Sequence, residues 1–223
     1  MTHLENALNL LKEEVKNMWE LVGSQLTKAR SSFLSFDKNL AREVMHIERR
    51  VNALELKIDR DCEDILALHT PVAIDLRLII ATLKINSNLE RIGDFAEGIA
   101  KHVLHSEKPF DAELVKSTKV IEMYDAAIDM FNDALVAFEN EDTLLARTVF
   151  GRDEFLDDIN SQVNVLIAEY LKNFPSNLDQ ALHGLSIIRK LERVGDHTKN
   201  IAEEIIFYID AKVIKHSNKK SLL

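Results

Sequence analysis

Apolar residues recur at helical spacing along nearly the whole chain. In the first stripe an apolar side chain returns every three or four positions, and most charged side chains lie off it. This stripe consists of Leu4, Leu8, Leu11, Val15, Met18, Val22 and Leu26. A pattern of this kind is typical of amphipathic helices that bury one face. We therefore expect an all-α protein.

Helix-breaking and capping residues divide the pattern into six long helices. Asp37 suits the N-cap of the second helix, and Thr70 with Pro71 fits the cap and first turn of the third. The expected helices span 3–33, 38–69, 71–104, 112–139 after an Asp111 cap, 143–173, and a stretch from the turn at 175–177 towards Lys215. The segment 105–111 is the clearest linker, and the tail 216–223 is expected to fray.

The two halves of the chain repeat each other. Adding 105 to first-half numbers pairs Met18 with Met123, and beyond the two proline turns the offset becomes 102. With that second offset, "LERIGD" at 89–94 falls on "LERVGD" at 191–196. Such a period indicates internal duplication. We therefore expect two tandem three-helix bundles, residues 1–107 and 108–223.

Composition supports a soluble globular protein. The 223 residues are 46% hydrophobic and 29% charged, and only 6 Gly and 3 Pro occur, which favours long helices. A net charge of −9 argues against binding to nucleic acid or to an anionic membrane. The apolar runs are too short to cross a bilayer. The single Cys62 is expected to be a buried core residue, and the protein is expected to be cytoplasmic, without direct membrane insertion.

Acidic residues occupy matched positions in the two halves. The third helix of each half carries Glu-x-x-x-Asp, and the second helix carries a related pair. The candidate metal ligands are Glu48, Asn52, Glu90 and Asp94 in the first half and Asp153, Asp157, Glu192 and Asp196 in the second. A spacing of four places both side chains on one helix face, and neighbouring helices can bring two such faces together. Converging carboxylates raise each other's pKa, and hard cations or iron would neutralise them.

Glycines inside the repeated motifs support this interpretation. Gly93 and Gly195 each cost about 1 kcal/mol against alanine in a helix interior, but they would let a neighbouring group approach between the acids. The alternative is a solvated surface on which Arg91 and Arg193 form salt bridges. The duplication of the whole arrangement favours a site. His197 has no histidine counterpart in the first half, so we interpret it as a surface or interface residue.

At these residues the chain resembles the PhoU family of bacterial phosphate-uptake regulators. The pattern P-x-A-x-D-L-R followed by L-E-R-I-G-D carries the resemblance, which also extends over "MWELVGSQLTKA", "VNALELKID" and "LSIIRKLERVGDHTKNIAEEI". The resemblance implies a PhoU-like six-helix architecture with multinuclear clusters on the E(D)-x-x-x-D motifs, of iron or else of Mn, Mg or Zn. It also implies a homodimeric negative regulator of phosphate uptake and phosphate-starvation signalling. The implied partners are the ATPase subunit of the phosphate ABC transporter and a sensor histidine kinase, which would hold the protein peripheral to the inner membrane.

Two residues depart from the family pattern. Asn52 stands where the second half has Asp157 and the family motif has Asp. Gly98 stands where the second half and the family have Asn, here Asn200. Because Asn52 removes one carboxylate, we expect a weaker or differently populated metal site in the first half.

Two other functions remain open at this point. A di-metal carboxylate oxidoreductase in a helical bundle would use two Glu-x-x-His motifs, whereas the chain offers one, Glu43-x-x-His46, without a repeat counterpart. A metal-free interaction scaffold would need no such residues. The sequence contains nothing like a nucleotide-binding glycine loop and no nucleophile beside an obvious base. We therefore expect a protein that is not an enzyme.

Overall fold

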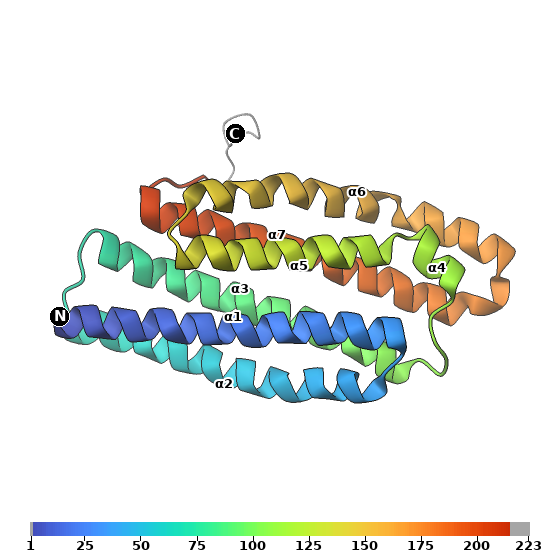
Figure 1. Ribbon diagram of the computed structural model, residues 1–223, viewed down its shortest axis with the longest axis horizontal. Coiled ribbons are helices and arrows are strands. Elements are labelled where there is room, and N and C mark those ends of the chain that lie inside the picture. Colours follow the sequence, from blue (N-terminus) through green and yellow to red (C-terminus); the bar gives the residue numbers. More distant parts are fainter. Residues whose placement is uncertain (1, 215–223) are drawn as a thin grey trace.

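Residues 2–214, the part that the computed structural model describes, form seven α-helices and one 3-10 turn (Figure 1). The elements are α1 (His3–Ser35), α2 (Lys38–Leu68), α3 (Ile74–His105), α4 (Ala112–Ser117), α5 (Val120–Glu139), α6 (Thr143–Asn173), the 3-10 turn η1 (Pro175–Asn177) and α7 (Leu178–Asp210). The predicted all-α class is confirmed. The expected division at residues 107/108 falls in the segment between α3 and α4.

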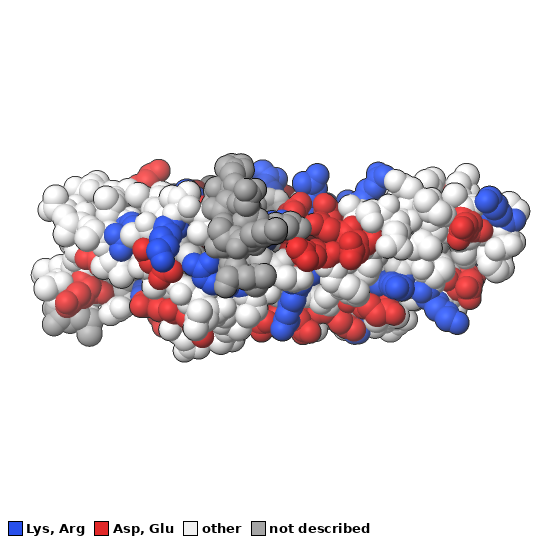
Figure 2. Space-filling model, turned by 90° about the horizontal axis from the view of Figure 1, so that it is seen from above, with Lys and Arg blue, Asp and Glu red and all other residues white. Residues whose placement is uncertain are grey.

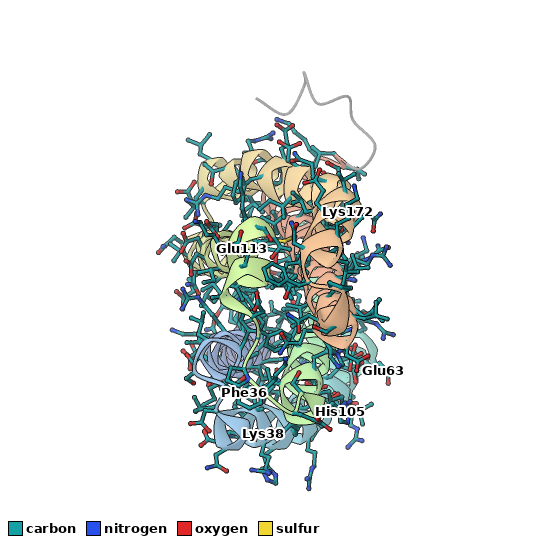
Figure 3. The ribbon with its side chains drawn as sticks, turned by 90° about the vertical axis from the view of Figure 1, so that its right-hand side faces the viewer. Phe36, Lys38, Glu63, His105, Glu113 and Lys172 are labelled. Atoms are coloured by element: carbon teal, nitrogen blue, oxygen red, sulfur yellow. The ribbon has the colours of Figure 1, made fainter. Side chains whose placement is uncertain are left out.

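The helices form two bundles that lie against each other lengthwise. Helices α1, α2 and α3 pack together, and α5, α6 and α7 pack together with the short α4 at one end (Figure 1). Helices α3 and α7 run side by side in opposite directions and join the two bundles, with a smaller contact between α1 and α5. In an end view the first bundle, with Phe36, Lys38 and His105, lies below the second, with Glu113 and Lys172 (Figure 3).

A single hydrophobic core runs through both bundles. Cys62 is fully buried in this core, which confirms the prediction for that residue. Burial raises the pKa of its thiol to about 12, so the group stays protonated. Within residues 2–214, no helix combines the length and the hydropathy that crossing a membrane requires.

Aromatic side chains connect the two bundles reciprocally. Trp19 of α1 is fully buried, and its Nε1 donates a hydrogen bond to the Phe131 carbonyl oxygen of α5 at 3.2 Å. Its ring centroid lies 5.6 Å from that of Phe131 and 5.8 Å from that of Phe138. The repeat counterpart of Trp19 is Tyr124, which is also buried and has its ring centroid 6.3 Å from that of Phe33 in α1. Each bundle thus places an aromatic ring against the other.

The prediction of one unbroken helix between Asp111 and Glu139 is wrong. Asp111 does cap a helix, since it accepts hydrogen bonds from two backbone N–H groups, but that helix ends at Ser117. The Thr118 hydroxyl donates to the Leu114 carbonyl oxygen at 2.7 Å, and Lys119 adopts a left-handed φ of 53°. Serine and threonine hydroxyls compete for backbone carbonyls in this way, which weakens a helix at such a pair.

Two other predicted helix ends also differ from the structure. Asp37 caps α2 as predicted, but Thr70 and Pro71 lie in the turn that precedes α3. Ala73 has a φ of 50° and provides no side-chain cap, so α3 begins only at Ile74. At the other end of the chain, Ala211 adopts a φ of 56° and ends α7. Lys215 and the tail 216–223 lie outside the described residues.

Candidate functional site

The first carboxylate cluster lies between α2 and α3. Glu48 of α2 is 4% exposed, whereas Glu90 and Asp94 of α3 are partly buried. A Cβ atom placed on Gly93 would lie 3.1 Å from Glu48 Oε2, closer than such contacts normally are. The glycine therefore lets the carboxylate of Glu48 approach the backbone of α3 between the two acids of the repeated motif.

Gln25 of α1 is the hydrogen-bonding partner of Glu48. Its Nε2 donates to Glu48 Oε2 at 2.6 Å. Two acceptor atoms of this pair, Glu48 Oε1 and Gln25 Oε1, are buried and receive no hydrogen bond. A buried acceptor without a donor is costly, and most such atoms in folded proteins are satisfied. These two oxygens therefore mark a position that a proton donor or a cation would stabilise.

The second cluster repeats this arrangement with a different partner. Asp153 of α6 is 4% exposed and faces the Glu192 and Asp196 motif of α7. A Cβ atom on Gly195 would lie 3.2 Å from Asp153 Oδ1. Here the Lys199 ammonium donates to Asp153 Oδ2 and lies 3.5 Å from Asp196 Oδ1. An ammonium thus occupies the role that the Gln25 amide has in the first cluster.

Burial raises the pKa of the carboxylates that lead each cluster. For Glu48 the rise in pKa comes first from desolvation, is opposed by the Gln25 hydrogen bond, and is increased by the charges of Asp94 and its neighbours. For Asp153 desolvation again raises the pKa, and the Lys199 ammonium offsets part of the rise. Protons therefore compete with any cation at these sites, so that cation binding would weaken as the pH falls.

The arginines inside the two motifs pair along their own helices. Arg91 Nη1 lies 3.2 Å from Asp94 Oδ2, and Arg193 Nη1 lies 3.4 Å from Asp196 Oδ2. The salt bridges considered as the alternative role of these arginines are therefore present. Both arginines are largely exposed, and exposed ion pairs contribute little to stability. These exposed ion pairs do not explain why Glu48 and Asp153 are buried.

The candidate ligands divide by burial. Glu48 and Asp153 are buried, the α3 and α7 acids are partly buried, and Asn52 and Asp157 are exposed one turn further along α2 and α6. Asp157 acts on the second cluster through its charge, which raises the pKa of Asp153. Figure 2 shows acidic side chains gathered near the middle of the face along which α6 and α7 run.

Two residues that contact the buried acids, Gln25 and Lys199, were not predicted from the sequence. A polar Gln25 inside the first apolar stripe was one available signal. The other was the difference between the repeats at Lys199, which the offset of 102 pairs with Glu97. Gln25 contacts Glu48 from another helix. Lys199 contacts Asp153 from another helix and Asp196 from the next turn of the same helix. Their part in the clusters therefore depends on how the helices pack.

The two clusters differ in the groups that already contact their buried carboxylates. In the described part of the chain, no three Asp, Glu, His or Cys side chains are arranged so that they could hold a metal ion. The first cluster adds an amide oxygen to its carboxylates, and Mg²⁺ and similar ions keep several water ligands in protein sites. In the second cluster Asp153 and Asp196 are already engaged by Lys199.

The remaining residues considered from the sequence lie elsewhere. Glu43 Oε2 pairs with Lys28 Nζ at 2.6 Å on the surface, and His46 is exposed. His197 of α7 is partly buried, with its Nδ1 2.8 Å from Asn88 Oδ1 of α3 and its ring against Phe95. This position of His197 between α7 and α3 agrees with its interpretation as an interface residue.

A histidine pair lies at one end of the contact between the bundles. His102 Nδ1 of α3 lies 2.7 Å from His183 Nδ1 of α7, and His102 Nε2 lies 2.8 Å from Ser186 Oγ. Burial, together with the nearby charges of His183, Lys190 and His105, lowers the pKa of His102 to about 4. The folded chain therefore keeps His102 neutral at pH values where an unfolded chain would protonate it.

We expect His102 to make the protein less stable in mild acid. Because the pKa of His102 is lower in the folded state, its contribution is fully present above the ordinary value of 6.5 and is lost as the pH falls towards 4. Replacing His102 by glutamine should reduce the loss of unfolding free energy between pH 7.5 and pH 5 by about 1 kcal/mol. Urea denaturation at both pH values measures this loss of stability, with the exposed His46→Gln as control. Identical pH dependence in wild type and His102→Gln would contradict the prediction.

Comparisons with known proteins cover both bundles. The family model described as PhoU domain matches residues 15–103 and 120–205. The phosphate-specific transport system accessory protein PhoU homolog 1 of Thermotoga maritima is 33% identical over 214 residues, which cover 96% of this chain and 91% of the relative. The homolog from Aquifex aeolicus is 34% identical and covers 94% of each chain. The crystal structure of PhoU from Pseudomonas aeruginosa matches with a TM-score of 0.88 and 30% identity, over 94% of this chain and 100% of the other.

Proposed function

The chain belongs to the PhoU family, and on that premise we propose that it is an accessory protein that regulates a phosphate transport system. The observation that carries the proposal is that the family match falls on both bundles and not on one alone. Relatives with about a third of their residues identical are named as accessory proteins of phosphate-specific transport, and they align over nearly the full chain. The fold agrees with a solved PhoU structure over 94% of this chain and the whole of the other.

The finer proposal concerns how the protein acts. We propose that it is a negative regulator of phosphate uptake and of phosphate-starvation signalling, and that it connects the transporter ATPase subunit with a sensor histidine kinase. The long bundles present extended faces to partners. Around the turn between α2 and α3, apolar side chains such as Leu68 (77% exposed) and Val72 (68% exposed) offer contact area. In this proposal the protein acts as a homodimer in the cytoplasm, next to the inner membrane through its partners.

We also propose that the carboxylate clusters bind metal ions, with iron as the first candidate and Mn, Mg or Zn as the others. Oxygen ligands alone do not choose among these metals. The support comes from the buried Glu48, whose Oε1 receives no hydrogen bond, and from the glycine beside it. Such an ion would neutralise carboxylates on α2 and α3 and so hold the two helices in one arrangement.

The test is a pull-down of the full chain from phosphate-replete and phosphate-starved cells, with metal content measured on the same untagged sample. We expect the transporter ATPase and the sensor kinase to be recovered, together with a stoichiometric metal. Recovery of neither partner in either condition would contradict the adaptor role. Protein that carries no metal, and whose stability does not change in variants of the clusters, would instead favour a metal-free scaffold. Oxygen consumption by iron-loaded protein would favour an oxidoreductase.

A further inference from the structure

The contact between α3 and α7 has an approximate twofold symmetry that follows from the duplication. The two helices run in opposite directions (Figure 1), and the offset of 102 pairs each residue of α3 with a residue of α7. Phe95 and His197 form one such pair, and their ring centroids lie 5.6 Å apart. A contact on one side of these two rings therefore has a counterpart on the other side, so the two ends of the α3–α7 contact can be compared position by position.

Charged groups hold the end of this contact at the start of α3, which we call the Lys84 end. Lys84 Nζ lies 2.9 Å from Glu204 Oε2, and Glu204 is only 3% exposed. The same ammonium lies 5.3 Å from the centre of the Phe207 ring. Arg77 Nε donates a hydrogen bond to the Tyr208 carbonyl oxygen at 3.1 Å. Because hydrogen bonds between ionised groups are stronger than those between neutral groups, the ion pair ties the two helices together at this end.

Imidazole and hydroxyl groups hold the opposite end of the contact, which we call the His102 end. The repeat places Ser186 and His102 where the Lys84 end has its lysine and its glutamate. Ser186 Oγ lies 2.8 Å from His102 Nε2, and His102 Nδ1 lies 2.7 Å from His183 Nδ1. In the second contact one ring nitrogen has to donate and the other has to accept, so the two Nδ1 atoms share one proton. The histidine pair can therefore carry at most one positive charge while this contact is closed.

The surroundings of the histidine pair disfavour an added proton. The charges that act on His102 are positive, and with burial they lower its pKa to about 4; they belong to His183, Lys190 and His105. His183 also lines a cavity of about 530 Å³, whose other charged or titratable lining residues are His105, Glu107, Lys108 and Asp179. A proton added to His102 would therefore be poorly compensated, and the cavity leaves room for the helices to separate at this end.

We propose that the His102 end of the α3–α7 contact opens in mild acid while the Lys84 end stays closed, so that protons control one end of the joint between the two bundles. Histidine ordinarily changes its charge between pH 5 and 8, whereas lysine and glutamate ordinarily remain charged there. In the open form His102 and His183 can each bind a full proton in water. Because the open form binds more protons than the closed form, its population rises as the pH falls. This opening does not depend on the proposed regulatory function or on metal binding.

The test measures distances between α3 and α7 in the full chain by double electron–electron resonance at pH 7.5 and pH 5. Nitroxide labels are attached to two matched pairs of introduced cysteines, K101C/L182C at the His102 end and the repeat-equivalent I80C/E203C at the Lys84 end. The native Cys62 is buried and does not compete for the label. We expect the population of a longer distance in the first pair to rise about fivefold or more at pH 5, and that in the second pair to change by less than about twofold. Longer distances in both pairs, or an unchanged first pair, would overturn the proposal.

Two variants connect the opening with His102. The double variant H102E/S186K places the residue types of the Lys84 end at the repeat-equivalent positions of the His102 end, and it should abolish the pH dependence of the first distance. His102→Gln keeps a hydrogen-bonding side chain that does not titrate, so it should limit the rise to less than about twofold. Circular dichroism confirms folding, and His102→Gln alone decides if the double variant does not fold. A rise as large as that of wild type in either folded variant would overturn the proposal.

Discussion

Replacing Trp19 by alanine should lower the free energy of unfolding by about 3–5 kcal/mol. The indole is fully buried, and it packs on Phe131 and Phe138 of the other bundle. Alanine would remove this contact, leave a cavity between α1 and α5, and delete the hydrogen bond to the Phe131 carbonyl oxygen. A loss of this size is a large part of the stability of about 5–15 kcal/mol that is usual for folded proteins.

Urea denaturation followed by circular dichroism measures the effect of Trp19→Ala. Two variants serve as controls. Trp19→Phe keeps a ring at the contact and should cost about 1–2 kcal/mol. Tyr124→Phe removes a buried hydroxyl that has no hydrogen-bond partner, so it should leave the stability unchanged or raise it. A Trp19→Ala midpoint equal to that of wild type would show that the α1–α5 contact does not stabilise the fold.

The helices were largely predictable because their signals are local. Asp37 and Asp111 are capping residues next to periodic apolar stripes, and both cap helices in the structure. The errors occur where the backbone adopts a positive φ at a residue other than glycine, at Ala73, Lys119 and Ala211. Such conformations are costly, and surrounding packing has to hold them in place. A single sequence carries no local signal for that packing.

The candidate site was predictable only in part, because its contacts also depend on packing that has no local signal in the sequence. A spacing of four residues fixes which helix face Glu90 and Asp94 share, and the duplication shows that the arrangement recurs. Which side chain meets a buried acid from another turn or another helix depends on the packing of the bundle. Gln25 and Lys199 therefore appeared only with the structure, and with them the difference between the two clusters.

Replacing Gly195 by valine should lower the free energy of unfolding by about 2–3 kcal/mol. A Cβ atom there would come within 2.6 Å of Leu156 Cδ2 and 3.2 Å of Asp153 Oδ1, and the γ-methyl groups of valine need further space. Neither neighbour can withdraw easily, because Leu156 is fully buried in the core and Asp153 is held by Lys199. The substitution would therefore push α6 and α7 apart at the second cluster.

Gly151 of the neighbouring α6 provides the matched control for Gly195→Val. It is also helical, but it is exposed, and a Cβ atom there would meet nothing within 4 Å. Gly151→Val should therefore change the free energy of unfolding by less than about 0.5 kcal/mol. Guanidinium denaturation of both variants and of wild type measures the difference. If Gly195→Val were as stable as Gly151→Val, the close approach of the Asp153 carboxylate to the α7 backbone would not constrain this position. The repeated glycine would then need another explanation.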